Sequence, residues 1–292
     1  MRLLMLKLSL LPLLLGLAWP LPAQVLWSVQ GPDEQQNWLL GTVHSEDARL
    51  LEFSPEVLGA LAAADRLALE LVPDMGMLEQ LNLAMHYETA RLHEVVDAAV
   101  YAELASIMDQ AYGIGEPALR RMRPWAAAMT ISVPPPQTGL FMDLVLSIRA
   151  NGLGKDVVAL EQLDEQLAFL AGMSKSMQLD MLTQAVRDFS RRDELFEELV
   201  QTWLAGDLDQ LEAVAREQMS NLSPELMAHF EQIGMVQRNH TMVERALPWL
   251  EAGGLMIAVG ALHLPGDEGL IRLLRERGFV VEPVPEGYFG SD

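Results

Sequence analysis

Two histidines near opposite ends of the chain stand in the same short context. His44 ends the phrase Gly-Thr-Val-His, and His263 ends the phrase Gly-Ala-Leu-His. In both, an apolar run leads into the glycine, and the histidine follows three positions later. A neutral imidazole can bind a metal ion or act as a general base. By spacing alone, two unrelated loop histidines are the simpler explanation, but two copies after similar apolar runs favour two halves of one site.

Glu70 is the third candidate, because nearly all its neighbours in the segment Leu-Ala-Leu-Glu-Leu-Val are apolar. A glutamate in such a segment is costly unless it is paired, hydrogen-bonded or bound to a metal. It could equally face water on an edge strand or pair with an arginine. A carboxylate beside two histidines would form an oxygen and nitrogen donor set that suits manganese, cobalt, iron or zinc.

Arg238 and Asn239 are adjacent in the segment Gln-Arg-Asn-His-Thr-Met, where arginine beside asparagine could clamp a carboxylate or a substrate carbonyl. The pattern alone is more typical of a solvated helix face. We expect His240 to lie at the surface. The remaining histidines have no supporting context: His86, His93 and His229.

Segments near both ends of the chain are expected to form the sheet that positions these side chains. Two short apolar runs flank the turn sequence Gly-Pro-Asp at residues 31–33, which predicts a hairpin. Residues 66–72 alternate in polarity, which predicts a strand. Residues 255–260 and 279–284 are short apolar runs that predict two further strands.

Helices are expected between and after these strands. Ser54 followed by proline predicts a helix start, and residues 267–277 predict a helix closed by Gly278. From about residue 76 to 250 the apolar spacing is helical, with one short strand plausible at 156–161. This predicts an α+β fold: a mixed β-sheet built from N- and C-terminal segments, with a large helical insertion between them. Both G-x-x-H phrases would then leave strand ends at one edge of the sheet.

The first 23 residues have the pattern of a secretory signal peptide. Arg2 and Lys7 precede a leucine-rich stretch that ends in small residues and prolines, so cleavage is expected after Ala23. An uncleaved membrane anchor is the alternative, but the apolar core is short and interrupted by prolines. We therefore expect an exported chain, periplasmic or secreted, with no stable membrane insertion after cleavage. Residues 24–292 are expected to form a single domain.

Composition excludes several classes of protein. The net charge is −21, and −23 once the signal peptide is removed, so phosphate backbones would repel the chain and no nucleic-acid partner is expected. There is no cysteine, so disulfides cannot stabilise the fold. The sequence has no nucleophile elbow, no H-E-x-x-H, no P-loop and no dinucleotide fingerprint, which argues against serine hydrolases, zincins and nucleotide enzymes.

Several segments occur together in an order that resembles the TraB/GumN family, which includes the Tiki proteases. They are WLLGTVHSED, LALELVP, RPWAAAM, VVALEQLDEQL, RNHTM and VGALHLPGDEGLIRLLRERGFVVEPV. The resemblance covers nearly all of the mature chain. It implies a metal-dependent hydrolase whose histidines are His44 and His263, whose glutamate is Glu70, and whose arginine–asparagine pair is Arg238 and Asn239. It also implies a fold similar to erythromycin esterase and the haem-binding ChaN protein.

The hypothesis from sequence is therefore an exported metal-dependent hydrolase, peptidase-like, that acts on a peptide or small molecule. Mn²⁺ or Co²⁺ is the cofactor that the resemblance implies, with His44, Glu70 and His263 as its ligands. The membrane tether and the substrate of Tiki members do not transfer to this chain. The alternative is a non-enzymatic protein that binds haem, iron or a partner on the same fold.

Overall fold

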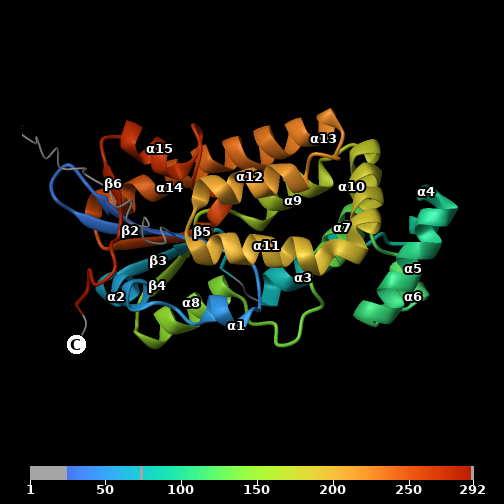
Figure 1. Ribbon diagram of the computed structural model, residues 1–292, viewed down its shortest axis with the longest axis horizontal. Helices are drawn as coiled ribbons and strands as arrows, with labels where there is room; N and C mark the ends of the chain where they lie inside the picture. The colour runs from blue at the N-terminus through green and yellow to red at the C-terminus, as the bar shows by residue number, and fades with distance from the viewer. Residues whose placement is uncertain (1–24, 73–74, 291–292) are drawn as a thin grey trace, which may run out of the picture.

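The computed structural model describes residues 25–72 and 75–290, and its centre is a mixed sheet with strand order β4-β3-β5-β2-β1-β6 (Figure 1). The strands are β1 (Leu26–Gln30), β2 (Gln36–Thr42), β3 (Arg66–Leu69), β4 (Asp156–Ala159), β5 (Leu255–Gly260) and β6 (Val280–Pro283). Strands β4, β3, β5 and β2 are parallel, whereas β1 pairs antiparallel with both β2 and β6. The predicted signal peptide lies outside the described residues.

The predicted pairing of the two ends of the chain is confirmed. Strands β1 and β2 form the expected hairpin, and β2 lies beside β5, with Thr42 opposite Gly260. The strands predicted at residues 66–72 and 156–161 also form, as β3 and β4, and they extend the sheet on the other side of β5. The expected α+β class with a mixed sheet is therefore what the structure has.

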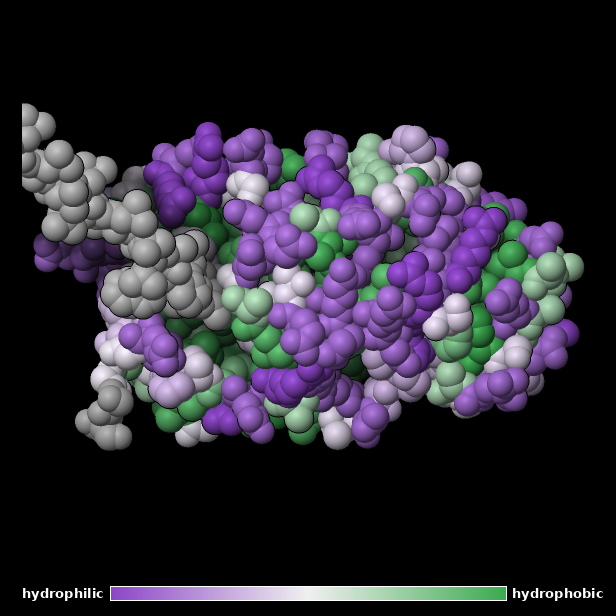
Figure 2. Space-filling view, viewed as in Figure 1, coloured by the Kyte–Doolittle hydropathy of each residue, from purple (hydrophilic) through white to green (hydrophobic). Residues whose placement is uncertain are grey.

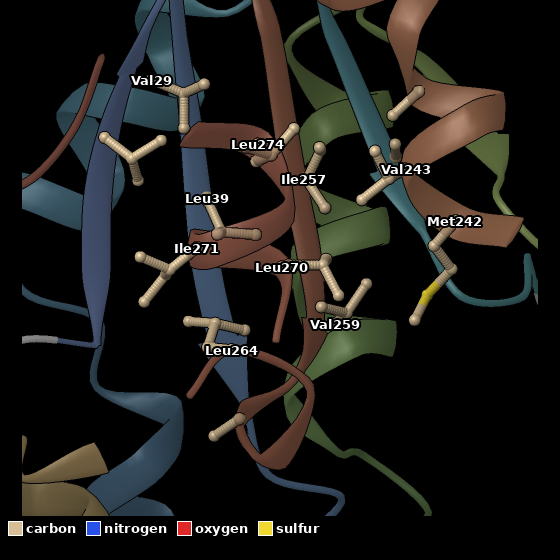
Figure 3. Close-up of a cluster of buried hydrophobic side chains, with 14 of the residues drawn as sticks. Val29, Leu39, Met242, Val243, Ile257, Val259, Leu264, Leu270, Ile271 and Leu274 are labelled. Atoms are coloured by element: carbon tan, nitrogen blue, oxygen red, sulfur yellow. The ribbon is translucent and has the colours of Figure 1, made fainter. Parts of the chain in front are cut away.

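Helices α14 (Arg238–Ala252) and α15 (Leu270–Glu276) cover one face of the sheet. Figure 3 shows Leu39 and Ile257 of the strands facing Leu270 and Leu274 of α15. Successive residues of a strand point to opposite faces, so the apolar run of each central strand supplies both sides of the sheet. The buried side chains of this cluster exclude water from the layer between sheet and helices.

Helix α15 is shorter than the predicted helix at residues 267–277. It begins at Leu270 because the preceding residues form a tight turn, in which Gly266 has a φ of 83°. It ends at Glu276, with Arg277 as its C-cap, and the predicted Gly278 follows one residue later with a φ of 89°. That left-handed conformation is the one that glycine adopts after a helix without strain.

Helices α2 (Pro55–Ala63) and α8 (Met142–Gly152) cover the opposite face of the sheet. The predicted start of α2 is confirmed, because the Ser54 side chain accepts a hydrogen bond from the backbone N–H of Val57. Leu146 of α8 is fully buried against this face. Helices on both faces are what a central parallel sheet requires, because neither of its faces can be left to water.

The remaining helices extend the molecule toward the right of Figure 1, except α1, which lies beside α8. They are α1 (Ala48–Leu51), α3 (Met75–Met85), α4 (Leu92–Val95), α5 (Ala98–Tyr112), α6 (Glu116–Leu119), α7 (Pro124–Ser132), α9 (Leu163–Ala171), α10 (Lys175–Asp188), α11 (Arg192–Ala205), α12 (Leu208–Gln218) and α13 (Pro224–His229). Short 3₁₀ turns lie at Phe189–Arg191 and Ala261–His263, and a π-helical stretch, Phe230–Gln237, leads into α14. The predicted insertion is thus helical, but β4 interrupts it and joins the sheet.

The part of the chain that the structure describes contains no helix both long enough and apolar enough to cross a bilayer. The face that carries α11 and α12 is mostly hydrophilic in Figure 2. This agrees with the acidic composition, because charged side chains on helices that cover a core stay in water.

Candidate functional site

The two G-x-x-H phrases meet at one edge of the sheet, as the sequence predicts. Strands β2 and β5 are adjacent and parallel, so the segments after Thr42 and Gly260 leave the sheet side by side. His44 and His263 both lie in these segments. In sheets of this kind, ligands bind outside the carboxyl ends of the strands, where the strand order changes direction.

Gly41 allows the two phrases to pack closely. A Cβ atom at this position would lie 3.0 Å from the Cα of Ala261, in the other phrase. The carbonyl oxygen of Gly41 accepts a 2.9 Å hydrogen bond from the Nε1–H of Trp203, on α11. Both glycines lie within the last residues of their strands rather than just beyond them. The glycine of the first phrase is therefore required by close packing of the backbone.

His263 is buried, with 5% of its surface exposed, and its ring orientation is fixed. Its Nδ1 lies 2.5 Å from Oδ1 of Asn239, whose Nδ2 donates a 2.7 Å hydrogen bond to the Glu268 carbonyl. Because that amide nitrogen is already donating to a carbonyl, Oδ1 is the acceptor and Nδ1 of His263 carries the proton. Burial lowers the pKa of His263 and outweighs the opposite effect of Glu70. The ring is therefore neutral at neutral pH, with the lone pair on Nε2.

Glu70 lies beside this ring, and its Oε1 is 3.8 Å from Nε2 of His263. The same oxygen accepts a 2.7 Å hydrogen bond from the backbone N–H of Gly260. The other oxygen, Oε2, accepts hydrogen bonds from Arg238 at 2.6 Å and from Gln166 at 3.2 Å. Burial opposes ionisation, but the charge that His263 carries when it is protonated, the Arg238 guanidinium and the Gly260 N–H outweigh it, so the pKa of Glu70 lies below its ordinary value.

Two details of the prediction for Glu70 are corrected. Strand β3 ends at Leu69, so Glu70 is the first residue beyond the strand rather than a member of it. The alternative of an edge strand facing water is wrong, because β3 lies between β4 and β5. The alternative of an arginine partner is confirmed by the ion pair with Arg238.

Arg238 joins two carboxylates from different strand ends. It donates to both oxygens of Glu161, at 2.8 and 2.6 Å, as well as to Glu70. Glu161 follows β4, and only 1% of its side chain is exposed. The solvated helix face expected for Arg238 and Asn239 is therefore wrong: Asn239 is buried and Arg238 is largely buried. Two carboxylates distant in sequence provide the charge that makes burial of the arginine tolerable.

His44 differs from His263 because it lies in an exposed loop. Its ring packs on the ring of Phe141, with 3.9 Å between centroids and 37° between planes. The surrounding protein desolvates the ring and lowers its pKa, while the negative charges of Glu70 and Glu46 act in the opposite direction. The structure thus brings the two histidines to one edge, but buries only one of them.

The loop that carries His44 is held residue by residue by the start of α8. The Phe141 ring packs on His44, the Met142 Sδ accepts the Val43 N–H at 3.3 Å, and the Asp143 Oδ1 accepts the Thr42 hydroxyl at 3.1 Å. From the first contact to the third, the residue number falls from 44 to 42 in the loop and rises from 141 to 143 at the start of α8. This antiparallel arrangement fixes the position of the first G-x-x-H phrase relative to α8.

Three polar residues of the site were not predicted from the sequence. Asp143 is the first: burial, with a contribution from the charge of Glu70, raises its pKa to about 6. Glu161 and Gln166 are the others, and both hydrogen-bond within the Glu70–Arg238 network. The position of Glu161 as the last residue of the strand predicted at 156–161 was the one available signal. Nothing in the local sequence marks Asp143, because it reaches the site through the packing of α8.

The other histidines lie apart from this cluster. His240 is exposed and pairs with Glu268 at 2.8 Å, which confirms its surface position. His229 lies 2.8 Å from the Phe169 carbonyl, to which its Nε2 is hydrogen-bonded. Nδ1 of His86 is hydrogen-bonded to the Asn82 carbonyl of the preceding helix, α3, and His93 packs beside Tyr101.

A divalent metal ion needs several nitrogen or oxygen donors grouped around one point. Within residues 25–72 and 75–290, no three His, Cys, Asp or Glu side chains are grouped closely enough to hold one. Two donors nevertheless lie close together: Nε2 of His263 is 3.8 Å from Oε1 of Glu70. The Nδ1–H hydrogen bond to Asn239 is the supporting contact that histidine ligands of metals usually make. His44 lies after the end of the neighbouring strand, β2.

Comparison with known proteins identifies the family. The model of the TraB/PrgY/gumN family matches residues 25–283, so the chain belongs to this family. The match runs from the first strand to the last and includes every residue of the site described above. Searches of the curated proteins and of the solved structures found no match.

Proposed function

We propose that this member of the TraB/PrgY/gumN family is an exported metal-dependent hydrolase that acts on peptides. The observation that carries the proposal is the pairing of His263 and Glu70. A buried neutral imidazole of fixed tautomer and an ionised carboxylate converge at the carboxyl ends of adjacent strands. Such a pair can bind a metal ion or transfer a proton.

His263, Glu70 and His44 are the residues that would hold the ion, in agreement with the ligands expected from sequence. A divalent ion, Mn²⁺ or Co²⁺, would supply Lewis-acid chemistry at the scissile carbonyl. Glu70 suits the role of ligand better than that of base. Its pKa is lowered and both of its oxygens accept hydrogen bonds, which makes it a weak proton acceptor at neutral pH.

Asp143 is better suited to accept the proton of an attacking water. Its pKa of about 6 lies near neutrality, where a general base combines a substantial ionised fraction with useful basicity. Its Oδ1 is anchored by the Thr42 hydroxyl, and its position beside the His44 loop puts it on the same side of the sheet. The carboxylate thus has both a fixed position and a suitable pKa.

Arg238 and Asn239 act in this proposal by positioning the catalytic groups. Arg238 is occupied by Glu70 and Glu161, so its charge holds the Glu70 carboxylate ionised and in place. Asn239 is occupied by His263 and the Glu268 carbonyl, so it fixes the ring. The roles of substrate clamp or oxyanion donor, suggested by the sequence, would require these side chains to leave their present partners.

Metal content of the purified mature chain tests the proposal. The chain is loaded with Mn²⁺ or Co²⁺, desalted and measured by mass spectrometry beside the double variant His44→Ala/His263→Ala. His240→Ala, which changes a surface histidine, is the matched control. We expect retention of about one ion by the native chain and the control, and none by the double variant. Peptide hydrolysis should follow the same order.

Two results would contradict the proposal. Equal metal content in the native chain and the double variant would place the ion elsewhere. A haem Soret band that depends on His44 or His263, without peptide hydrolysis, would favour the binding protein instead. Export is tested separately: N-terminal sequencing of the chain from the periplasm or medium should begin at Gln24, after Ala23.

A further inference from the structure

A cavity of about 770 Å³ lies beside the candidate site, and His44 forms part of its wall. Most of its other lining comes from the loop after His44, the proline-rich segment at 133–138 and the beginning of α11, and Tyr112, Thr130 and Phe141 complete it. The volume is within the range of small-molecule and peptide sites. Because His44 contributes to the wall, a ligand in this cavity would touch one of the proposed metal ligands.

The proline-rich wall is held rigidly. The carboxylate of Glu46 accepts hydrogen bonds from the backbone N–H groups of Gln137, Thr138 and Gly139, at 2.6 to 2.9 Å, and from the Thr138 hydroxyl. These donors, the Thr138 N–H foremost, lower the pKa of Glu46 to about 2, so the anchor is ionised at neutral pH. A wall fixed before binding reduces the entropy that a ligand must lose.

The three consecutive prolines, residues 134–136, determine what this wall can recognise. Proline has no N–H, so the main chain here can accept hydrogen bonds but cannot donate them. The proline rings present an apolar surface, and the aromatic rings of Phe141 and Phe196 also line the cavity. The wall therefore suits a ligand with an apolar side chain and N–H donors, as an extended peptide has.

The charged groups of the cavity are acidic. Four carboxylates line it: Glu46, Asp47, Asp193 and Glu197. Among the lining residues that the structure describes, none is Lys or Arg. Two arginines behind the lining offset part of this charge. Arg49 is shared by Asp47 and Glu197, the latter at 2.7 Å, and Arg192 lies 2.6 Å from Asp193. Two negative charges remain uncompensated, so the field in the cavity attracts cations and repels acidic chains.

We propose that this cavity is the substrate cleft and that it selects an extended peptide in which an apolar residue adjoins a lysine or arginine. The inference rests on the proposed function, because it places the substrate of that hydrolase. The apolar side chain would pack against Phe141 and Phe196, and the cationic side chain would lie toward Asp193 and Glu197 on α11, where it competes with Arg192 and Arg49 for their carboxylates. The aromatic rings also favour a nearby cation.

Fluorescence anisotropy with three labelled hexapeptides tests this selection. The peptides are Ala-Ala-X-Phe-Ala-Ala, with Lys, Gln or Glu at X, and the protein is the metal-loaded full chain. We expect the Lys peptide to bind about fivefold more tightly than the Gln peptide, and the Glu peptide more weakly still. The preference should shrink when the salt concentration is raised from about 50 to about 300 mM. Mass spectrometry of the same samples counts the cleaved peptide.

The double variant Asp193→Asn/Glu197→Gln should remove most of the preference for Lys while leaving binding of the Gln peptide unchanged. Both residues are largely solvent-exposed, so the fold should not depend on them. Glu194→Gln, on the same helix but outside the cavity lining, is the matched control and should keep the preference.

The outcomes distinguish this inference from the proposed function. Binding that favours Lys and depends on Asp193 and Glu197, without cleavage, would keep the cleft and reject the hydrolase. Cleavage with equal binding of all three peptides would keep the hydrolase and overturn the selection. A preference for Lys that survives in the double variant would also overturn it, because the cation would then be recognised elsewhere.

Discussion

Replacing Asn239 by alanine should release the tautomer of His263. Asn239 accepts the Nδ1–H of His263 at 2.5 Å and donates to the Glu268 carbonyl at 2.7 Å. Alanine removes both contacts and leaves the buried Nδ1–H without its acceptor, at a cost of about 1–3 kcal/mol for that group and about 1 kcal/mol for the second hydrogen bond. For a domain of this length we expect the melting temperature to fall by about 5–10 °C.

The effect on the site should exceed this general loss of stability. A metal-binding histidine that loses the acceptor of its other ring N–H typically loses about 10- to 100-fold in metal affinity. Asn37→Ala is the matched control, since the buried Asn37 amide also binds backbone groups, donating to the Leu250 and Gln35 carbonyls and accepting the Leu255 N–H, at the opposite, amino ends of β2 and β5. It should be destabilised similarly but should keep its affinity for Mn²⁺.

A direct measurement of the tautomer completes the test. Long-range ¹⁵N–¹H spectra of the imidazole groups, assigned with His263→Ala, should show the proton on Nδ1 of His263 in the native chain. Asn239→Asp keeps an acceptor and should keep both this signal and most of the affinity. A native proton on Nε2, or equal Mn²⁺ affinity in Asn239→Ala and the native chain, would refute the reasoning.

Three further changes test the neighbourhood of the site. Gly260→Ala puts a Cβ atom 3.2 Å from Oε1 of Glu70, so hydrolysis should fall about tenfold through displacement of the carboxylate, whereas Gly152→Ala, which meets no neighbouring atom, should leave it unchanged. The raised pKa of Asp143, about 6, means that the native chain loses stability as pH rises from about 4 to 6. The melting temperature of Asp143→Asn should not fall over this pH range. A fall parallel to that of the native chain would show that another group is responsible. The lowered pKa of Glu46, about 2, means that its stabilisation is complete above about pH 4.5 and is lost as pH falls toward 2. The difference in urea midpoint between the native chain and Glu46→Gln should therefore be full at pH 6 and shrink by pH 3; a difference that does not change with pH would exclude the ionised anchor.

Local patterns in the sequence were enough to predict the strands of the sheet and to single out His44 and His263. The Gly-Pro-Asp turn, the alternation near Leu67 and the apolar run before Gly260 each depend on the chemistry of neighbouring residues, so β1 to β3 and β5 were predictable. Placing the terminal segments in one sheet was the simplest assembly, and it predicted that the two G-x-x-H phrases would meet at one edge. Because both phrases follow parallel strands, their histidines had to reach the same edge.

The state of each site residue was decided only by tertiary contacts. Arg238 lies on a helix whose local pattern is that of a solvated face, yet it is buried because Glu70 and Glu161 arrive from distant strand ends. Asp143 enters the site because α8 packs along the loop before His44, a contact between segments about a hundred residues apart. Burial, charge pairing and the shift of a pKa depend on what the rest of the chain brings near, and a local sequence pattern carries no information about such neighbours.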